Sequence, residues 1–190
     1  MITSLFPKRK LKERCTFCKI HMQTTRFKPG SLNLGMERTH EYNVGITWTG
    51  NSGAGTKNYR SYERSHSIHI HGKEVINGSS DAAFRGDKTK HTPEDLFVAS
   101  ISACHMLWYL HLCAEAGVNV IAYEDNAFAI MTEMSDGAGQ FTEVILRPRV
   151  TVTDTSMLDA AQAQHKKANA LCFIARSLNF EVKHEAVIVV

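Results

Sequence analysis

Residues 91–117, HTPEDLFVASISACHMLWYLHLCAEAG, decide the fold of this chain. Thr92 suits the cap of a helix N-terminus, and the Pro-Glu-Asp triplet that follows suits the first helical turn. Residues 96–116 are almost wholly apolar, and Gly117 suits the position just after a helix end. A helix that is apolar on every side is typically buried on every side. We therefore expect a central helix that is covered by sheet or by a second copy of the chain.

The rest of the chain combines short strand patterns with one further helix. The predicted strands are residues 41–49, 67–71, 74–77, 127–134, 143–154 and 182–190, and the second helix spans about residues 157–178. Glycine-containing turns separate the strands of two predicted hairpins. This order of elements is typical of an α+β domain.

Composition and charge exclude several classes of protein. The 190 residues are 22% charged and 43% hydrophobic, which favours one globular domain over a disordered or membrane-spanning chain. We find no apolar window long enough for a membrane span and no apolar core of a signal peptide near the N-terminus. Five cysteines in 190 residues are too few for a disulfide scaffold, and an odd number leaves one cysteine unpaired. A cytoplasmic protein without membrane contact is expected.

The basic residues are concentrated at the N-terminus. Residues 1–35 carry a net charge of +7, and residues 36–190 carry −4. An acidic body does not favour nucleic-acid binding. We interpret residues 1–35 as a basic extension outside the fold and residues 36–190 as the domain, with Met36 as a candidate natural start.

Two cysteines lie within the predicted helices. Cys104 lies in the middle of the first helix, and at 100° per residue Trp108 and His111 share its face. Cys172 lies in the second helix, on the same face as His165. Free cysteines are most often small core residues, and a reactive thiol is the alternative. Cys113, nine residues after Cys104, is beyond disulfide reach of it on one helix and is most simply a core residue.

Residues 91–104, with Glu94 ten residues before Cys104, resemble the signature of the OsmC/Ohr family of thiol peroxidases. Residues 167–172, KANALC, resemble the segment that carries the second cysteine of that family. The likeness extends from about residue 40 to residue 190. It implies an α+β, OsmC/Ohr-like fold, with antiparallel sheets wrapped around two long central helices in an intertwined homodimer.

The resemblance also implies an activity. A peroxidase of this family reduces organic hydroperoxides, as part of peroxide detoxification in oxidative and osmotic stress, and needs no cofactor. Cys104 would be the peroxidatic nucleophile and Cys172 the resolving thiol. A small dithiol or lipoyl-type reductant would restore both thiols. Glu94 would orient an arginine that stabilises the thiolate.

The chain departs from the family pattern at that arginine. Relatives carry it in the loop after the first strand, but residues 50–55, GNSGAG, contain no arginine. Arg60, Arg64 and Arg85 are the nearest substitutes. Arg85 could approach Glu94, and Arg64 could enter from the second strand. The departure favours a rival hypothesis, a non-catalytic member of the same fold that binds an apolar ligand.

Two further sets of residues are candidates for a substrate pocket and for a metal site. The candidate walls of an apolar substrate pocket are Phe97, Met106, Trp108 and Phe173. A metal-binding protein is a weaker hypothesis, with His69 and His71 on one strand face or Cys15 and Cys18 with His21 as ligands. A solvated hairpin and an unstructured tail are the simpler interpretations, and we predict no metal site.

Overall fold

Helix α1 (Pro93–Glu115) begins and ends where the sequence predicts. The Thr92 hydroxyl accepts a hydrogen bond from the Asp95 peptide N–H at 3.0 Å, and the Asp95 carboxylate accepts one from the Thr92 N–H at 2.9 Å. At the other end Gly117 has φ +70°. This left-handed conformation lets the Val118 N–H return to the Cys113 carbonyl at 2.9 Å and closes the helix.

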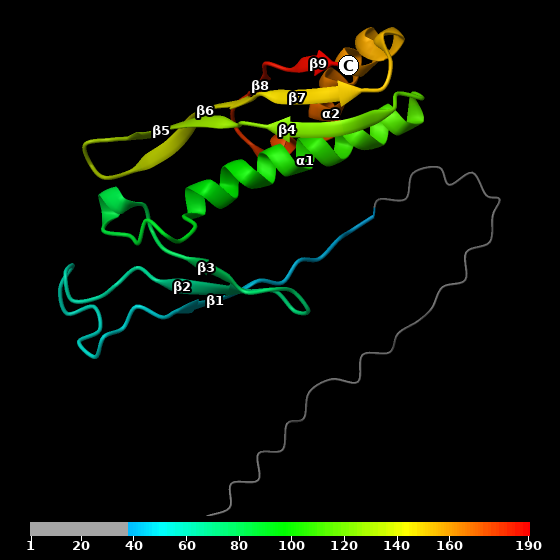
Figure 1. Ribbon diagram of the computed structural model, residues 1–190. Coiled ribbons are helices and arrows are strands. Elements are labelled where there is room, and N and C mark those ends of the chain that lie inside the picture. The colour runs from blue at the N-terminus through cyan, green and yellow to red at the C-terminus, as the bar shows by residue number, and fades with distance from the viewer. Residues whose placement is uncertain (1–37) are drawn as a thin grey trace, which may run out of the picture. The chain divides into compact units, whose positions relative to one another are not determined.

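The computed structural model describes residues 38–190, of which Tyr42–Val190 form one compact unit. The predicted extension, residues 1–35, and the Cys15–Cys18 pair lie outside the described residues. The described chain has mixed α and β content (Figure 1). Two α-helices and three three-stranded sheets make up this part of the chain.

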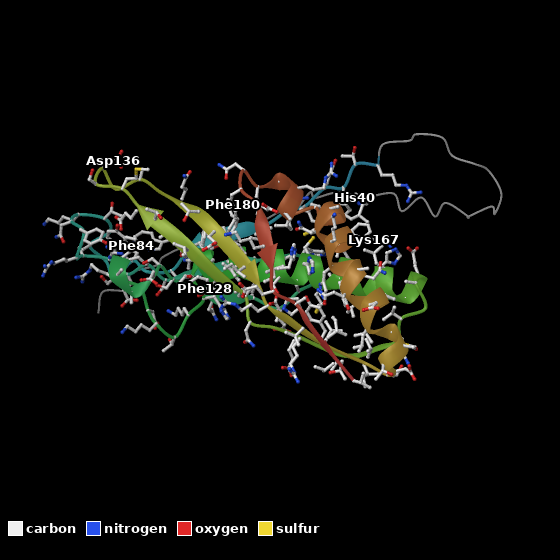
Figure 2. The ribbon with its side chains drawn as sticks, turned by 90° about the horizontal axis from the view of Figure 1, so that it is seen from above. His40, Phe84, Phe128, Asp136, Lys167 and Phe180 are labelled. Carbon is white, nitrogen blue, oxygen red and sulfur yellow. The ribbon has the colours of Figure 1, made fainter. Side chains whose placement is uncertain are left out.

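The sheets are formed by strands from distant parts of the sequence. The first has the order β1 (Gly45–Trp48), β2 (His66–His69), β3 (Ile76–Gly78). The second has the order β4 (Val120–Asp125), β7 (Pro148–Val152), β9 (Val187–Val189). The third has the order β5 (Phe128–Glu133), β6 (Gly139–Leu146), β8 (Val182–His184). Figure 2 shows Asp136 at the tip of the β5–β6 hairpin, where the sequence predicts a turn.

Four expectations about the strands need correction. Strand β4 was not predicted, the predicted strand 143–154 is divided at Arg147, and the predicted strand 182–190 is divided into β8 and β9. The sheets are also not wholly antiparallel, because β8 pairs with β6 and β9 pairs with β7 in parallel. Helix α2 lies between these strands in the chain, and such a crossover returns the chain in the parallel direction.

Helix α2 (Leu158–Leu171) is shorter than predicted, with 14 residues against 23 in α1. It ends because Cys172 has extended backbone angles, φ −63° and ψ 113°. A short 3₁₀ turn, Ala175–Ser177, follows. Cys172 is therefore the residue that caps the helix rather than a residue inside it.

Helix α1 buries one stripe of its surface rather than every side. The stripe consists of residues four apart, which stack on one face of a helix: Ile101, His105, Tyr109 and Cys113. Leu107, on another face, is 63% exposed. The expected all-round burial is therefore not supplied by one copy of the chain.

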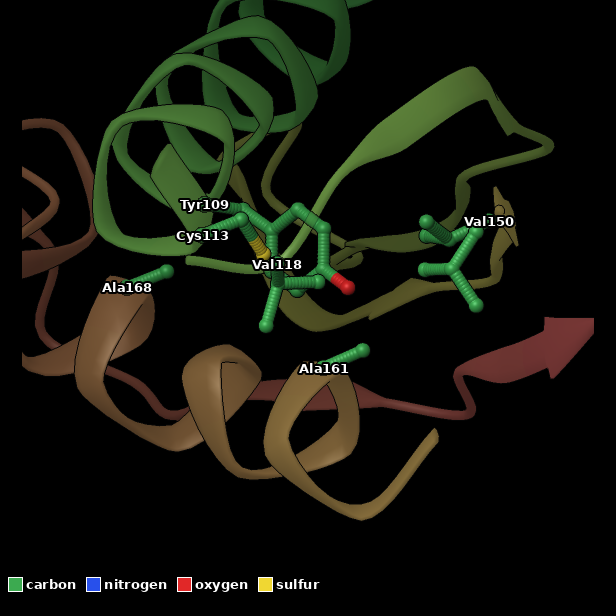
Figure 3. Packing of buried hydrophobic residues seen from close by; sticks show 7 residues of the cluster. Tyr109, Cys113, Val118, Val150, Ala161 and Ala168 are labelled. Atoms are coloured by element: carbon green, nitrogen blue, oxygen red, sulfur yellow. The ribbon is translucent and has the colours of Figure 1, made fainter. Parts of the chain in front are cut away.

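Two apolar cores lie beneath the helices. One joins the C-terminal half of α1 to α2 and β7, and Figure 3 shows Ala161 and Ala168 of α2 facing Tyr109 and Cys113 of α1. The other joins Ile101 to residues of β6 and β8. By length and composition α1 could also cross a membrane, which corrects the expectation that no such window exists. Its packing against these cores gives the helix another reason to be apolar.

Candidate active site

The two predicted thiols are neighbours. Cys104 is partly exposed on α1, whereas Cys172 is fully buried at the end of α2. Burial, and then a hydrogen bond with the Cys104 thiol, raise the pKa of Cys172 to about 11. The Cys172 Sγ also accepts a hydrogen bond from the Ala175 N–H at 3.4 Å, which holds the sulfur within the turn after α2. The two thiol groups are thus close enough to influence each other's ionisation.

An apolar cavity of about 830 Å³ opens at Cys104. Trp108 and Phe173 both line it, in an edge-to-face contact with ring centroids 5.5 Å apart. The remaining lining residues are Tyr42, Lys73, Ser100, Ala103, Leu107, His111 and Ile174. The cavity has the size and apolar character that small-molecule sites usually have.

The other two predicted pocket walls lie elsewhere. Phe97 stacks on Phe141 of β6, with ring centroids 4.6 Å apart, and packs against the Ile101 core. Met106 lines a second cavity, of about 810 Å³, on another side of α1. The prediction that these two side chains border the Cys104 cavity is wrong. Phe97 lies two helical turns, about 10 Å along the axis, before Cys104, and Met106 projects from a different face of the helix.

Neither proposed arginine reaches Cys104 within one protomer. The Arg64 guanidinium donates to the carbonyls of Tyr62 at 2.6 Å and Tyr59 at 2.8 Å, and it stacks on both of these rings. Arg85 has φ +66° and lines a small polar cavity with Asp87. Among the described residues, no arginine lines the Cys104 cavity, and Lys73 is the lining residue with a permanent positive charge.

Glu94 is also separate from Cys104. It lies in the first turn of α1, ten residues away, which is about 15 Å along the helix axis. Its carboxylate lines the second cavity together with Asp95 and Asp125. One carboxylate oxygen, Oε2, is buried without a hydrogen-bond partner in the described structure. Glu94, Arg64 and Arg85 are therefore not brought together with the thiols of their own chain.

Comparison with known proteins decides the family. The model of the OsmC-like protein family matches residues 86–186, which contain α1, α2 and both thiols. The chain belongs to the OsmC-like family. A solved OsmC-like protein of unknown function from Vibrio cholerae is 33% identical, with a TM-score of 0.70, over 78% of this chain and 100% of that one.

Solved relatives of lower identity share the fold. An organic hydroperoxide resistance protein from Elizabethkingia anophelis is 20% identical, with a TM-score of 0.57, over 80% of this chain and 99% of that one. The organic hydroperoxide resistance protein OhrB of Bacillus subtilis is 19% identical, with a TM-score of 0.54, over 78% and 98%. No curated protein matches the sequence. The OsmC/Ohr-like fold, inferred from residues 91–104 and 167–172, is confirmed.

The OsmC-like chain also contains a buried histidine cluster that the sequence did not predict. His105 of α1 and His165 of α2 are 1% and 3% exposed, and the His105 Nε2 lies 3.0 Å from the His165 Nδ1. His184 of β8 packs on His105, with ring centroids 4.7 Å apart. Burial lowers the pKa of His105 to about 3 and that of His165 to about 4. The three residues are far apart in sequence, so no local pattern joins them.

The histidines considered as metal ligands form no such site. Strand β2 ends at His69, so His71 lies in the turn rather than on the same strand. Within residues 38–190, no group of three or more His, Cys, Asp or Glu side chains is arranged to hold a metal ion. Cys15, Cys18 and His21 lie outside the described residues.

Proposed function

We propose that the protein is a two-cysteine thiol peroxidase that reduces organic hydroperoxides. One observation carries the proposal: the thiol groups of Cys104 and Cys172 are close enough to interact, and an apolar cavity opens at Cys104. The family supports it, since solved members include organic hydroperoxide resistance proteins. An apolar cavity favours alkyl and aryl hydroperoxides over hydrogen peroxide, because their organic group loses its contact with water on binding.

The environments of the two thiols assign their roles. Cys104 is accessible from the cavity, and we assign it the first attack. Its thiolate bonds to one oxygen of the hydroperoxide, the O–O bond breaks, and an alcohol leaves after taking a proton. Cys172, fully buried and with a pKa of about 11, is protonated at neutral pH and suits the second step. Its sulfur then attacks the sulfenic acid, releases water and forms a disulfide.

A dithiol reductant completes the cycle. One of its thiolates attacks the Cys104–Cys172 disulfide, and its second thiol displaces the resulting mixed disulfide. The reductant leaves as its own disulfide, and both protein thiols are restored. The apolar lining of the cavity suits the hydrocarbon chain of a lipoyl-type dithiol. No cofactor enters this cycle, and a reducing cytoplasm suits it.

The same proposal includes a homodimer. Alternate side chains along one face of the first sheet are exposed and apolar: Tyr42, Val44, Ile46 and Trp48. Leu107 exposes a second apolar surface on α1. A second copy of the chain is the occupant that covers both surfaces at once. In such a dimer Glu94 and an arginine enter the site from the partner subunit, because neither reaches Cys104 of its own chain.

Light scattering after size exclusion tests the dimer. We expect about twice the chain mass of 21.2 kDa at micromolar concentration. The variant Leu107→Asp places a charge on the exposed surface of α1 and is expected to shift the protein toward the monomer, with Lys167→Asp at an exposed position on α2 as a control. A wild-type mass near 21.2 kDa contradicts the dimer.

A thiol count tests the activity. The background variant carries Cys15→Ser and Cys18→Ser, so that Cys104, Cys113 and Cys172 are the remaining thiols. One equivalent of cumene hydroperoxide should remove two thiols per chain and release cumyl alcohol. Cys172→Ser in this background should instead accumulate the Cys104 sulfenic acid and its over-oxidised forms, detected by mass spectrometry.

One observation favours a second candidate function. Because no arginine lines the Cys104 cavity in the described structure, a binding protein for an apolar ligand is the alternative. The same thiol count separates the two candidates. An unchanged count of three thiols, together with tight binding of cumyl alcohol, favours the binding protein.

A further inference from the structure

A buried histidine pair joins α1 to α2 beside the two thiols. The His105 Nε2 and the His165 Nδ1 are 3.0 Å apart, and the two rings lie within 1° of parallel. Besides the contact between the two thiols at the end of α2, this hydrogen bond joins the two helices directly. It lies in the interior, where a polar contact is stronger than in water and its loss is costlier.

The pair is placed where it controls the distance between the thiols. His105 directly follows Cys104 on α1, and His165 lies two helical turns before Cys172 on α2. The Cys172 N–H donates to the Ala168 carbonyl of α2 at 2.9 Å, so Cys172 moves with that helix. Figure 3 shows Ala168 facing α1. A small side chain there resists sliding only weakly, and a directional hydrogen bond is needed to fix the register.

The surroundings of the pair keep it neutral. Tyr109 stacks on His165 with ring centroids 4.0 Å apart, and His184 covers His105. The outer ring nitrogens, Nδ1 of His105 and Nε2 of His165, have no hydrogen-bond partner in the described structure. Glu181 and Asp125 act on His184. Glu181 and Lys166 also line a polar cavity that His165 borders, but neither makes a hydrogen bond or ion pair with the pair. If an outer nitrogen gained a proton, the new N–H would have no hydrogen-bond acceptor in the described structure.

A neutral pair makes one good hydrogen bond. One ring donates an N–H and the other accepts with a lone pair, which is possible when each ring carries a single proton. Two protonated rings would point N–H toward N–H and repel each other. The hydrogen bond and the helix register thus depend on the same protonation state.

We propose that the His105–His165 pair is a positioning device for disulfide closure, which fixes α2 on α1 so that the Cys172 thiol meets Cys104. The inference rests on the proposed function, because it assigns a role in the closure of the same thiol pair. Neither histidine touches the hydroperoxide in this account. Both act by holding the two sulfur atoms close together, which raises the effective concentration of one thiol at the other.

Equilibration with glutathione measures that effective concentration without peroxide. The protein dithiol and glutathione disulfide exchange to give the protein disulfide and two molecules of reduced glutathione, so two thiols are oxidised and one disulfide is reduced. The Cys15→Ser, Cys18→Ser background confines the exchange to the remaining thiols. We expect His165→Leu and His105→Leu to lower the equilibrium constant by about tenfold or more, since proximity is what they remove.

Conservative variants separate positioning from general packing. In His165→Asn the amide occupies the place of Nδ1, so we expect the equilibrium constant to return toward the wild-type value. His71→Asn, an exposed histidine in the β2–β3 turn, is the matched control and should change nothing. If a leucine variant does not fold, His165→Gln replaces it, because its amide extends toward the place of Nε2 and away from His105.

Nitrogen NMR of the wild-type histidines supplies a second signature. At pH 7 we expect both rings to be neutral, each with one protonated nitrogen. We also expect a nitrogen–nitrogen coupling or a nitrogen chemical shift that reports the hydrogen bond between them. An imidazolium at either residue overturns the proposal, and so does an unchanged equilibrium constant in a folded His165→Leu. A wild-type protein that forms no disulfide with glutathione overturns the proposed function itself and this role with it.

Discussion

Two faces of α1 carry the same kinds of side chain and use them differently. One face buries Tyr109 and Cys113 against α2 and β7, and the other leaves Cys104 and Trp108 along an open cavity. Burial raises the pKa of Cys113, which has the aromatic core around it and no neighbouring thiol to react with. Cys104 has both a neighbouring thiol and a route to solvent. Position on the helix, rather than residue type, separates the structural cysteine from the chemical one.

The largest expected effect is on the open face. Cys104→Ser should reduce the consumption of cumene hydroperoxide, with dithiothreitol as reductant, to the uncatalysed background, because a serine hydroxyl is not ionised at neutral pH. Cys113→Ser on the buried face is the matched control and should keep most of the activity. Wild-type consumption by Cys104→Ser would remove the basis for the proposed mechanism.

The buried face should dominate stability. Tyr109 is fully buried, and Tyr109→Ala is expected to lower the free energy of unfolding by about 3–5 kcal/mol. His111→Ala, at an exposed position on the open face, should cost clearly less in urea unfolding followed by circular dichroism. Equal losses would show that the two faces are not packed as differently as the structure has them.

Acid should weaken the buried face through its histidines. His105 and His165 have pKa values of about 3 and 4 in the folded chain, against 6.5 for an ordinary histidine. The unfolded chain therefore binds these protons first, and stability falls as the pH is lowered from about 6.5 toward 4. Midpoints of urea unfolding at several pH values measure this slope. His165→Asn should flatten it, whereas His71→Asn should leave it unchanged.

The smallest effect concerns substrate preference on the open face. Cumene hydroperoxide should exceed hydrogen peroxide in kcat/KM by about tenfold or more, since burial of an aromatic group contributes roughly 1.5–3 kcal/mol. Phe173→Ala should narrow this ratio, mainly by raising KM for the aromatic substrate. A preference for hydrogen peroxide would contradict an apolar substrate site between Trp108 and Phe173.

Sequence patterns predicted those parts of the molecule that depend on local signals. Thr92 and Gly117 mark both ends of α1, and the spacing from Glu94 to Cys104 led to the family. No such signal marks the end of α2, because residues 157–178 contain neither glycine nor proline. The helix stops at Leu171 because the backbone of Cys172 is extended and a short 3₁₀ turn follows. Helical extrapolation beyond that residue was therefore wrong.

The candidate site was predictable only in part. The Cys104 cavity includes Trp108 and Phe173 as predicted, but Phe97 lies two turns away along α1 and Met106 lies on another face. Contacts between distant residues escaped prediction altogether. His165 meets His105 across 60 residues of sequence, and β4 pairs with a strand beyond the next hairpin. Such pairings depend on the global arrangement of the chain, which no local pattern encodes.

Mapping of the oxidised cysteines tests the central claim most directly. The wild-type chain is treated with one equivalent of cumene hydroperoxide, the free thiols are alkylated, and the protein is digested without reductant. We predict one peptide pair linked by a disulfide between Cys104 and Cys172, with Cys113 recovered in its alkylated form. Alkylated Cys104 and Cys172 in a fully active protein, or a disulfide that joins either one to Cys113, would contradict the account.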